Sequence, residues 1–124
     1  MQIINRANAR MFTEVRLIEP KIVATIESSS YYVAPFGVDS GGTGYFVYLG
    51  LFTASTPSSP QHIDSEFLGD RVIVKALRQA VDGAIELDVL VRPNDAPMTA
   101  EPTVVVTKRY SIQNNAFVAL DAAQ

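Results

Sequence analysis

The residue types that most often carry chemistry are sparse in this 124-residue chain, and its one histidine stands close to two carboxylates. His62, Asp64 and Glu66 are spaced two apart, so on a β-strand they would share a face and could hold a divalent cation. The first two lie in residues 54–65, a segment rich in proline and serine that favours a solvated loop. Because the chain has no second histidine and no cysteine, a zinc site would need carboxylate ligands from elsewhere. We therefore expect neither a metal nor a cofactor.

Motifs for catalysis are absent from the sequence. A serine hydrolase would need His62 and a serine on a sharp G-x-S-x-G elbow, and no such motif occurs. The glycine run at 41–44 lacks the Lys-Ser/Thr of a P-loop, and we interpret it, with Ser40 before it, as a turn. Glu86 and Asp88 would share the charged outer face of one strand, whereas the two carboxylates of a glycosidase face each other across a cleft. The sequence thus predicts no enzymatic activity, although a site assembled from distant strands would leave no motif.

The strongest compositional feature is the segment from Ser28 to Ile63. Its 36 residues contain one charge, Asp39, and seven of the eleven aromatic residues of the chain. Interface cores are poor in charge and rich in aromatic residues, and tyrosine with serine and glycine also builds adaptable binding loops. The ordinary alternative is a sheet interior with uncharged loops. Six candidate interface or ligand residues follow from this segment: Tyr31, Tyr32, Tyr45, Phe46, Tyr48 and Phe52.

Charge is distributed unevenly along the chain. Ten basic and thirteen acidic residues give a formal net charge of −3, which disfavours nucleic-acid binding because that requires a basic surface. Residues 1–21 carry four basic and two acidic side chains, a net +2, which leaves −5 for the rest. Residues 1–13 are a candidate N-terminal arm, with a short helix over 3–12 as one form. In the arm, Arg6 and Arg10 either contact an acidic neighbour, such as a second copy of the chain, or are solvated.

Other features bear on the compartment. A chain without cysteine tolerates oxidising and reducing surroundings alike. Its first residues lack the apolar region of a signal peptide. The longest nearly apolar run, residues 45–52, is far shorter than the roughly 20 residues that span a bilayer. We expect synthesis in the cytosol and no contact with a membrane, with assembly into a virion or another particle as one context.

Alternating apolar and polar residues, separated by glycine and proline, predict seven or eight short strands. Residues 14–34 are expected to form strands that Pro20 interrupts and Pro35 ends. Residues 45–53 form a strand with apolar residues on both faces, which suits a central strand or an intersubunit contact. A final pair of strands is expected at residues 103–112 and 117–120, joined by a turn at Asn114-Asn115.

Residues 66–92 allow two interpretations. In the first they form a hairpin, with Asp82-Gly83 as a type I′ turn that pairs Val81 with Ala84. In the second, a helix covers residues 65–81, where apolar residues recur at every fourth position. The β-branched run at 72–74 favours the hairpin, because such residues lose side-chain freedom in a helix.

The expected fold is one all-β domain over residues 1–124, an antiparallel β-sandwich or barrel, with α+β as the alternative if 65–81 is a helix. The expected function is that of a non-enzymatic structural or assembly protein that self-associates as a homo-oligomer through its uncharged, aromatic-rich β surface. The alternative is a small binding module that recognises a sugar-like or other small ligand through exposed tyrosines. Neither hypothesis rests on a family motif.

Overall fold

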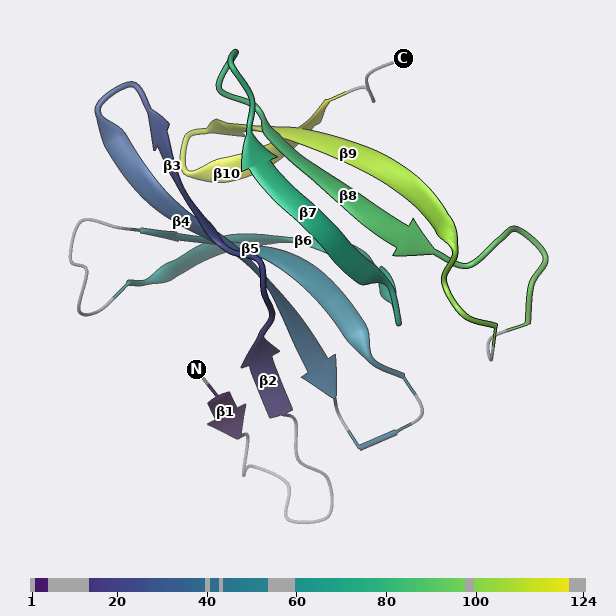
Figure 1. Cartoon of the computed structure of the whole chain (residues 1–124). Coiled ribbons are helices and arrows are strands. Elements are labelled where there is room, and N and C mark those ends of the chain that lie inside the picture. Colours follow the sequence, from purple (N-terminus) through teal and green to yellow (C-terminus); the bar gives the residue numbers. More distant parts are fainter. Residues whose placement is uncertain are drawn as a thin grey trace.

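A computed structural model of the chain describes residues 2–4, 14–39, 41–42, 44–53, 60–97 and 100–120. Within these ranges the chain forms β-strands and no helix, arranged as two antiparallel sheets packed face to face (Figure 1). The all-β sandwich prediction is therefore confirmed, and the alternative of a helix over 65–81 is wrong.

The larger sheet, sheet A, has the strand order β1-β2-β4-β5-β6, with β3 also pairing with β4. β2 pairs with the C-terminal part of β4, and β3 pairs with its N-terminal part. The strands are β1 (Gln2–Ile4), β2 (Glu14–Leu17), β3 (Ile22–Ile26), β4 (Ser29–Asp39), β5 (Phe46–Thr53) and β6 (His62–Asp70).

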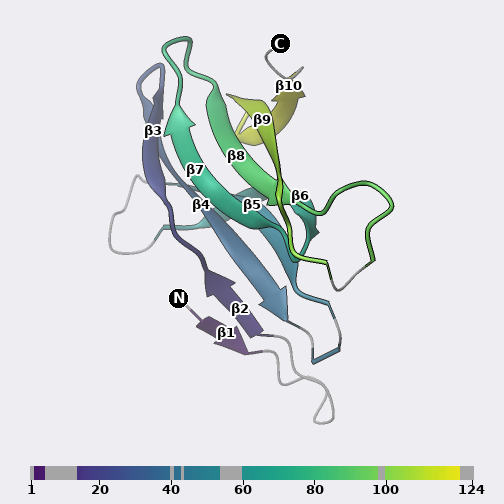
Figure 2. The same ribbon diagram turned by 45° about the vertical axis from the view of Figure 1, so that its right-hand side comes forward.

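The smaller sheet, sheet B, has the order β10-β9-β8-β7 and covers one face of sheet A. Figure 2 shows the two layers from a second side, with β1 and β2 extending below the part that sheet B covers. The strands are β7 (Ile73–Gln79), β8 (Ile85–Val91), β9 (Val104–Gln113) and β10 (Ala116–Leu120).

Two prolines explain why the long strand β4 pairs with two short strands on one side. Pro20 separates β2 from β3, as the sequence predicts. Pro35 does not end its strand, contrary to the prediction, because β4 continues to Asp39. The Pro35 carbonyl accepts a hydrogen bond from the N–H of Ile18 at 2.8 Å. In an antiparallel ladder the missing N–H of Pro35 lies on that same side, so the missing donor falls at the end of β2 and not in the pairing of β4 with β5.

The N-terminal strand corrects another expectation. Ile3 and Ile4 pair with Val15 and Glu14 of β2, so the helix expected over 3–12 is wrong at its first residues. Hydrogen bonding to a neighbouring strand stabilises these residues more than a short, marginal helix would. Arg6 and Arg10, the candidate contacts of the arm, lie outside the described residues.

The hairpin of β7 and β8 is confirmed, but its register differs from the prediction by one residue. Gln79 lies opposite Ile85, and the N–H of Ala80 donates to the carbonyl of Ala84 at 2.8 Å. The loop therefore has three residues, with Gly83 at φ 90° in its last position. A three-residue loop that ends in a left-handed glycine is the usual alternative to the two-residue type I′ turn.

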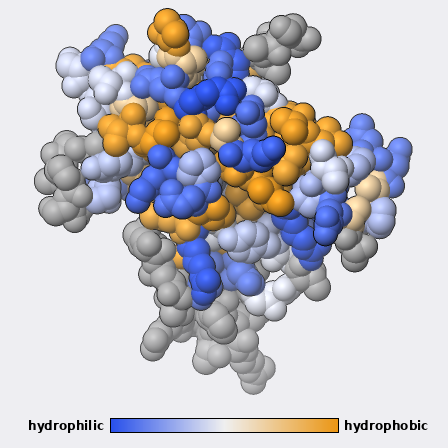
Figure 3. Space-filling view, in the orientation of Figure 1, coloured by the Kyte–Doolittle hydropathy of each residue, from blue (hydrophilic) through white to orange (hydrophobic). Residues whose placement is uncertain are grey.

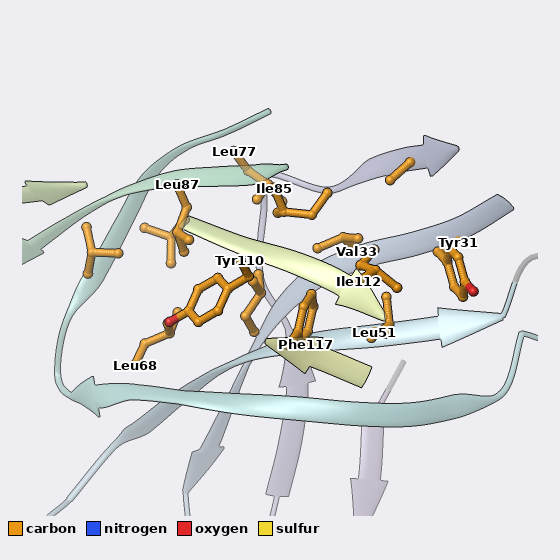
Figure 4. Packing of buried hydrophobic residues seen from close by; sticks show 14 of the residues in the cluster. Tyr31, Val33, Leu51, Leu68, Leu77, Ile85, Leu87, Tyr110, Ile112 and Phe117 are labelled. Carbon is orange, nitrogen blue, oxygen red and sulfur yellow. The ribbon is translucent and has the colours of Figure 1, made fainter. Parts of the chain in front are cut away.

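The hydrophobic core fills the space between the two sheets (Figure 4). β5 is an interior strand of sheet A, between β4 and β6, and Val47, Leu49 and Leu51 point from it toward sheet B. Ile85, Leu87 and Val89 share one face of β8, as predicted, and point from it toward sheet A. These six side chains are at most 1 % exposed, so the central strands of both sheets are anchored by close packing.

Polar side chains close both edges of the sandwich. At one edge the amide of Gln79 donates to the carbonyl of Thr25 at 3.0 Å and accepts from its N–H at 3.1 Å. At the other edge Asp64 Oδ2 accepts a hydrogen bond from the N–H of Phe117 at 2.8 Å. These contacts occupy backbone groups of β3 and β10 that would otherwise be open to pairing with another chain.

Candidate functional site

Six aromatic rings form a continuous row on the outer face of sheet A. Each ring contacts the next, with centroids between 5.2 and 6.3 Å apart. We call these residues the aromatic row. In order they are Phe46, Phe67, Tyr48, Phe36, His62 and Phe52.

Strand alternation places the central rings on the outer face. Because the odd-numbered residues of β5 from 47 to 51 fill the core, Phe46, Tyr48 and Phe52 point away from sheet B. Phe36 of β4 lies directly opposite Tyr48, and residues paired in this way share a face. The strand with two apolar faces that the sequence predicts at 45–53 is thus confirmed.

Two bulges in β6 bring the remaining rings to the same face. A bulge adds one residue to a strand, so the side chains beyond it change face. Phe67 lies opposite Tyr48 and is 54 % exposed, and His62 lies opposite Phe52. Asp64, on the other side of the second bulge, faces inward toward β10. The loop predicted for residues 54–65 is therefore wrong at its end, because β6 begins at His62. The bulge also separates His62 from the face that Asp64 and Glu66 share, so the three side chains do not lie together as they would on a regular strand.

Tyr48 shows how tightly the row is packed. Its ring stacks on Phe36 with centroids 5.2 Å apart and planes 12° apart. Phe67 packs against it at 5.2 Å with a tilt of 56°. Rings that contact aromatic neighbours in this way have less free ring face to offer a ligand. A sugar ring stacks on a flat, open aromatic face, so the row suits contact with another protein surface better.

The six surface aromatics predicted from the sequence divide between the two faces of sheet A. Phe46, Tyr48 and Phe52 belong to the aromatic row, and Tyr32 lies opposite Phe52 on the same face. Phe52 is only 8 % exposed, although its ring lies outside the core cluster. Tyr31 alternates with Tyr32 and therefore points to the core.

Tyr31 and Tyr45 correct the prediction, because both side chains pack on the inner side of sheet A. Tyr31 is 8 % exposed, and its hydroxyl donates to Asn115 Oδ1 at 2.7 Å. Tyr45 packs against the core with its ring over Gly37, where a Cβ would collide with the Tyr45 hydroxyl. Neither tyrosine is available to a ligand on the outer face.

Three members of the row were missed by sequence reasoning. Phe36 shares a strand face with Tyr32, but the sequence predicts that the strand ends at Pro35. His62 and Phe67 belong to β6, whose two bulges interrupt the regular alternation that reveals a strand. The only sequence signal for these two residues is the irregular spacing of the apolar and aromatic residues of β6, which is what a bulged strand produces.

The outer face of sheet B has the opposite character, because its charged side chains are paired with one another. Arg78 lies 2.9 Å from Glu86 and 3.2 Å from Asp88. Arg109 lies 2.9 Å from the same Glu86 and 2.8 Å from Asp82. The prediction that Glu86 and Asp88 form a charged outer strand face is confirmed.

Figure 3 views this face of sheet B, with hydrophilic side chains across its middle. Hydrophobic side chains lie on both sides of them. Among the residues of sheet B, Ile73, Leu90 and Val105 lie side by side on three strands. Ile73 is 49 % and Val105 55 % exposed. Apolar surface is therefore present here too, but it is aliphatic and lies beside a charged network.

Replacing Asp88 by asparagine is expected to reduce the loss of thermal stability that the protein suffers when the pH is lowered into the acid range. Hydrogen bonds from Arg78 and Thr107 hold the pKa of Asp88 below its ordinary value of 3.8. A carboxylate whose pKa is lowered by folding stabilises the folded state at pH values above its pKa in the unfolded chain. This stabilisation is lost as the pH falls through its lower pKa in the folded chain. Between about pH 5 and about pH 2, the melting temperature of the wild type should fall further than that of Asp88→Asn. Equal falls in thermal melts would show that these hydrogen bonds contribute nothing.

The polar side chains of the described residues form no fully buried group and no metal-binding cluster. No three of the His, Asp or Glu side chains among them could together hold a metal ion. Burial raises the pKa of Tyr110, with a smaller effect from Glu66, so its hydroxyl stays protonated at neutral pH. In the glycine run, the N–H of Gly41 donates to Asp39 Oδ1 at 2.9 Å, which is turn chemistry as predicted. Ser40 lies outside the described residues.

Comparison with known proteins gives no match to a protein-family model, to a curated protein or to a solved structure. Among the residues that the structure describes, no helix has the length and apolar character needed to cross a membrane. The function is therefore inferred from the geometry of the chain itself.

Proposed function

We propose that this protein is a non-enzymatic assembly module whose copies pack together through the aromatic row. The observation that carries the proposal is the row itself, six linked rings on the outer face of a sheet whose other face already covers the core. A sheet face of this composition is normally buried.

The outward positions of β4 and β5 around the row are uncharged as well as aromatic. Exposed apolar side chains flank it, Leu17 of β2 at 39 % and Val23 of β3 at 58 % exposure. Large apolar patches on a soluble protein mark interaction sites. Eight consecutive outward positions of β4 and β5 carry no charge: Tyr32, Ala34, Phe36, Val38, Phe46, Tyr48, Gly50 and Phe52.

The other surfaces of the sandwich are less suited to self-association. Sheet B presents ion pairs in the middle of its outer face, and desolvating these would cost free energy. Edge pairing is hindered at β3 by Gln79 and at β10 by Asp64. The bulges of β6 and the charges along it protect a third edge. Packing through the face of sheet A is therefore the favoured mode of contact.

A charge on the row should abolish association without unfolding the chain. Phe67→Lys is the sharpest variant, because this side chain is 54 % exposed and adds little to the core. Burying an aromatic side chain of this kind contributes about 1.5–3 kcal/mol, which lysine would replace by an unpaired buried charge. In light scattering behind a sizing column, the wild type should have a mass several times that of one chain, and Phe67→Lys the mass of one chain.

Val105→Lys is the matched control, because it places the same charge at a side chain of similar exposure on sheet B. It should keep the mass of the wild type, and both variants should melt within a few degrees of it. A wild type that stays monomeric at high concentration contradicts the proposal. So does an assembly that Val105→Lys disrupts and Phe67→Lys does not.

A further inference from the structure

His62 occupies a position inside the aromatic row. Its ring meets Phe36 edge-on, with centroids 5.9 Å apart and planes at 86°, and meets Phe52 at 5.3 Å and 50°. It therefore links the ring of β4 to the last ring of β5. Any surface that covers these two phenylalanines also covers His62.

His62 is the only histidine of the chain. Histidine is the side chain whose charge ordinarily changes between about pH 5 and about pH 8. The neutral imidazole packs as an aromatic ring, whereas the protonated ring is a cation. Of the six rings of the row, only this one can take up a proton and become a cation.

The strands packed beside His62 supply no carboxylate to pair with that charge. From β4 and β5 the side chains that share its face are uncharged, and their titratable groups are the hydroxyls of Tyr32 and Tyr48. The phenyl rings of Phe36 and Phe52 attract a cation weakly, but they do so in a single chain as well. That attraction therefore does not favour the assembled state.

Two of the carboxylates of β6 face inward, and the third shares the outer face but lies at the opposite end of the row from His62. Asp64 accepts the N–H of Phe117 on the inner side of the sheet, and Glu66 lies opposite the core residue Leu49. Asp70 lies opposite Phe46 at the far end of the strand, where its carboxylate accepts the N–H of Tyr45. Residues 54–59, which precede β6 in the chain, contain no ionisable side chain.

We infer that His62 is a pH switch of self-association, an inference that rests on the proposed function. Two copies that pack row against row with their His62 ends together bring two His62 side chains into a contact whose neighbouring side chains from β4 and β5 are uncharged. Protonation there would bury cations that have lost water and gained no counter-ion. The free chain, in which His62 is exposed, therefore takes up the proton more readily. By linkage, association weakens as pH falls.

The test compares the wild type with His62→Phe, which keeps a ring and cannot be charged. Dilution series of each full chain would be followed by sedimentation equilibrium at about pH 8, 7, 6 and 5.5. The apparent Kd of the wild type should rise at least tenfold across the series, while that of His62→Phe stays constant within twofold. His62→Lys should be monomeric throughout, because its charge is permanent.

Circular dichroism at each pH shows that the chain remains folded, and His62→Gln replaces His62→Phe if the latter folds poorly. A wild type that assembles equally at every pH overturns the switch and leaves the proposed function intact. So does an equal pH dependence in His62→Phe. A wild type that is monomeric even at pH 8 overturns the proposed function, and the switch with it.

Discussion

Replacing Tyr31 by alanine is expected to lower the free energy of unfolding by about 3–5 kcal/mol, the usual cost of removing a buried aromatic ring. The side chain is 8 % exposed and belongs to the core cluster. Its hydroxyl also donates to Asn115 in the turn between β9 and β10, so it joins sheet A to the end of a hairpin in sheet B. Urea denaturation followed by far-UV circular dichroism measures the loss.

Tyr48→Ala is the matched control, since it removes the same side chain from the outer face of the same sheet. Its loss should be less than half that of Tyr31→Ala, because the outer side of the ring borders solvent in a single chain. Tyr31→Phe separates the hydrogen bond from the ring, with an expected cost of about 1 kcal/mol. Equal losses for the two alanine variants would contradict the assignment of Tyr31 to the core and Tyr48 to the surface.

Replacing Leu49 by alanine is expected to cost about 2–5 kcal/mol, toward the upper end of that range. Leu49 is fully buried on β5, the strand that β4 and β6 flank. Strands on both sides limit how far the structure can collapse into the resulting cavity. In a domain of this size such a loss is a large part of the total stability. It should appear as a lower urea midpoint with an unchanged slope.

Leu17→Ala provides the comparison, because Leu17 is 39 % exposed at the end of β2. Its cost should stay below about 1 kcal/mol, as for most surface substitutions. If the two leucine variants unfold at the same urea concentration, β5 is not an interior strand of a packed sandwich.

Local rules of strand chemistry made much of the fold predictable. The alternation at 45–53 assigned each residue of β5 to one of two faces, and both assignments agree with the structure. The turn at Asn114-Asn115 was also predictable, because asparagine tolerates the positive φ of 53° and 62° found there. Such features depend on residues close together in the chain, so the sequence alone reveals them.

The face that meets the core was decided by the tertiary structure. Alternation separates Tyr31 from Tyr32, but only the packing of sheet B shows that Tyr31 is the buried one. Pro35 gives a similar case, since it is tolerated within β4 only because β2 ends beside it. Both outcomes depend on partners distant in sequence.

The candidate site itself depended on the bulges of β6. One extra residue at each bulge turns Phe67 and His62 to the outer face, which joins them to rings of β4 and β5. The sequence by itself determined the strands, their alternation and an uncharged aromatic segment. Only the tertiary structure decided which of these rings meet, because bulges and registers are set by hydrogen bonds between strands and not by the order of residues along one strand.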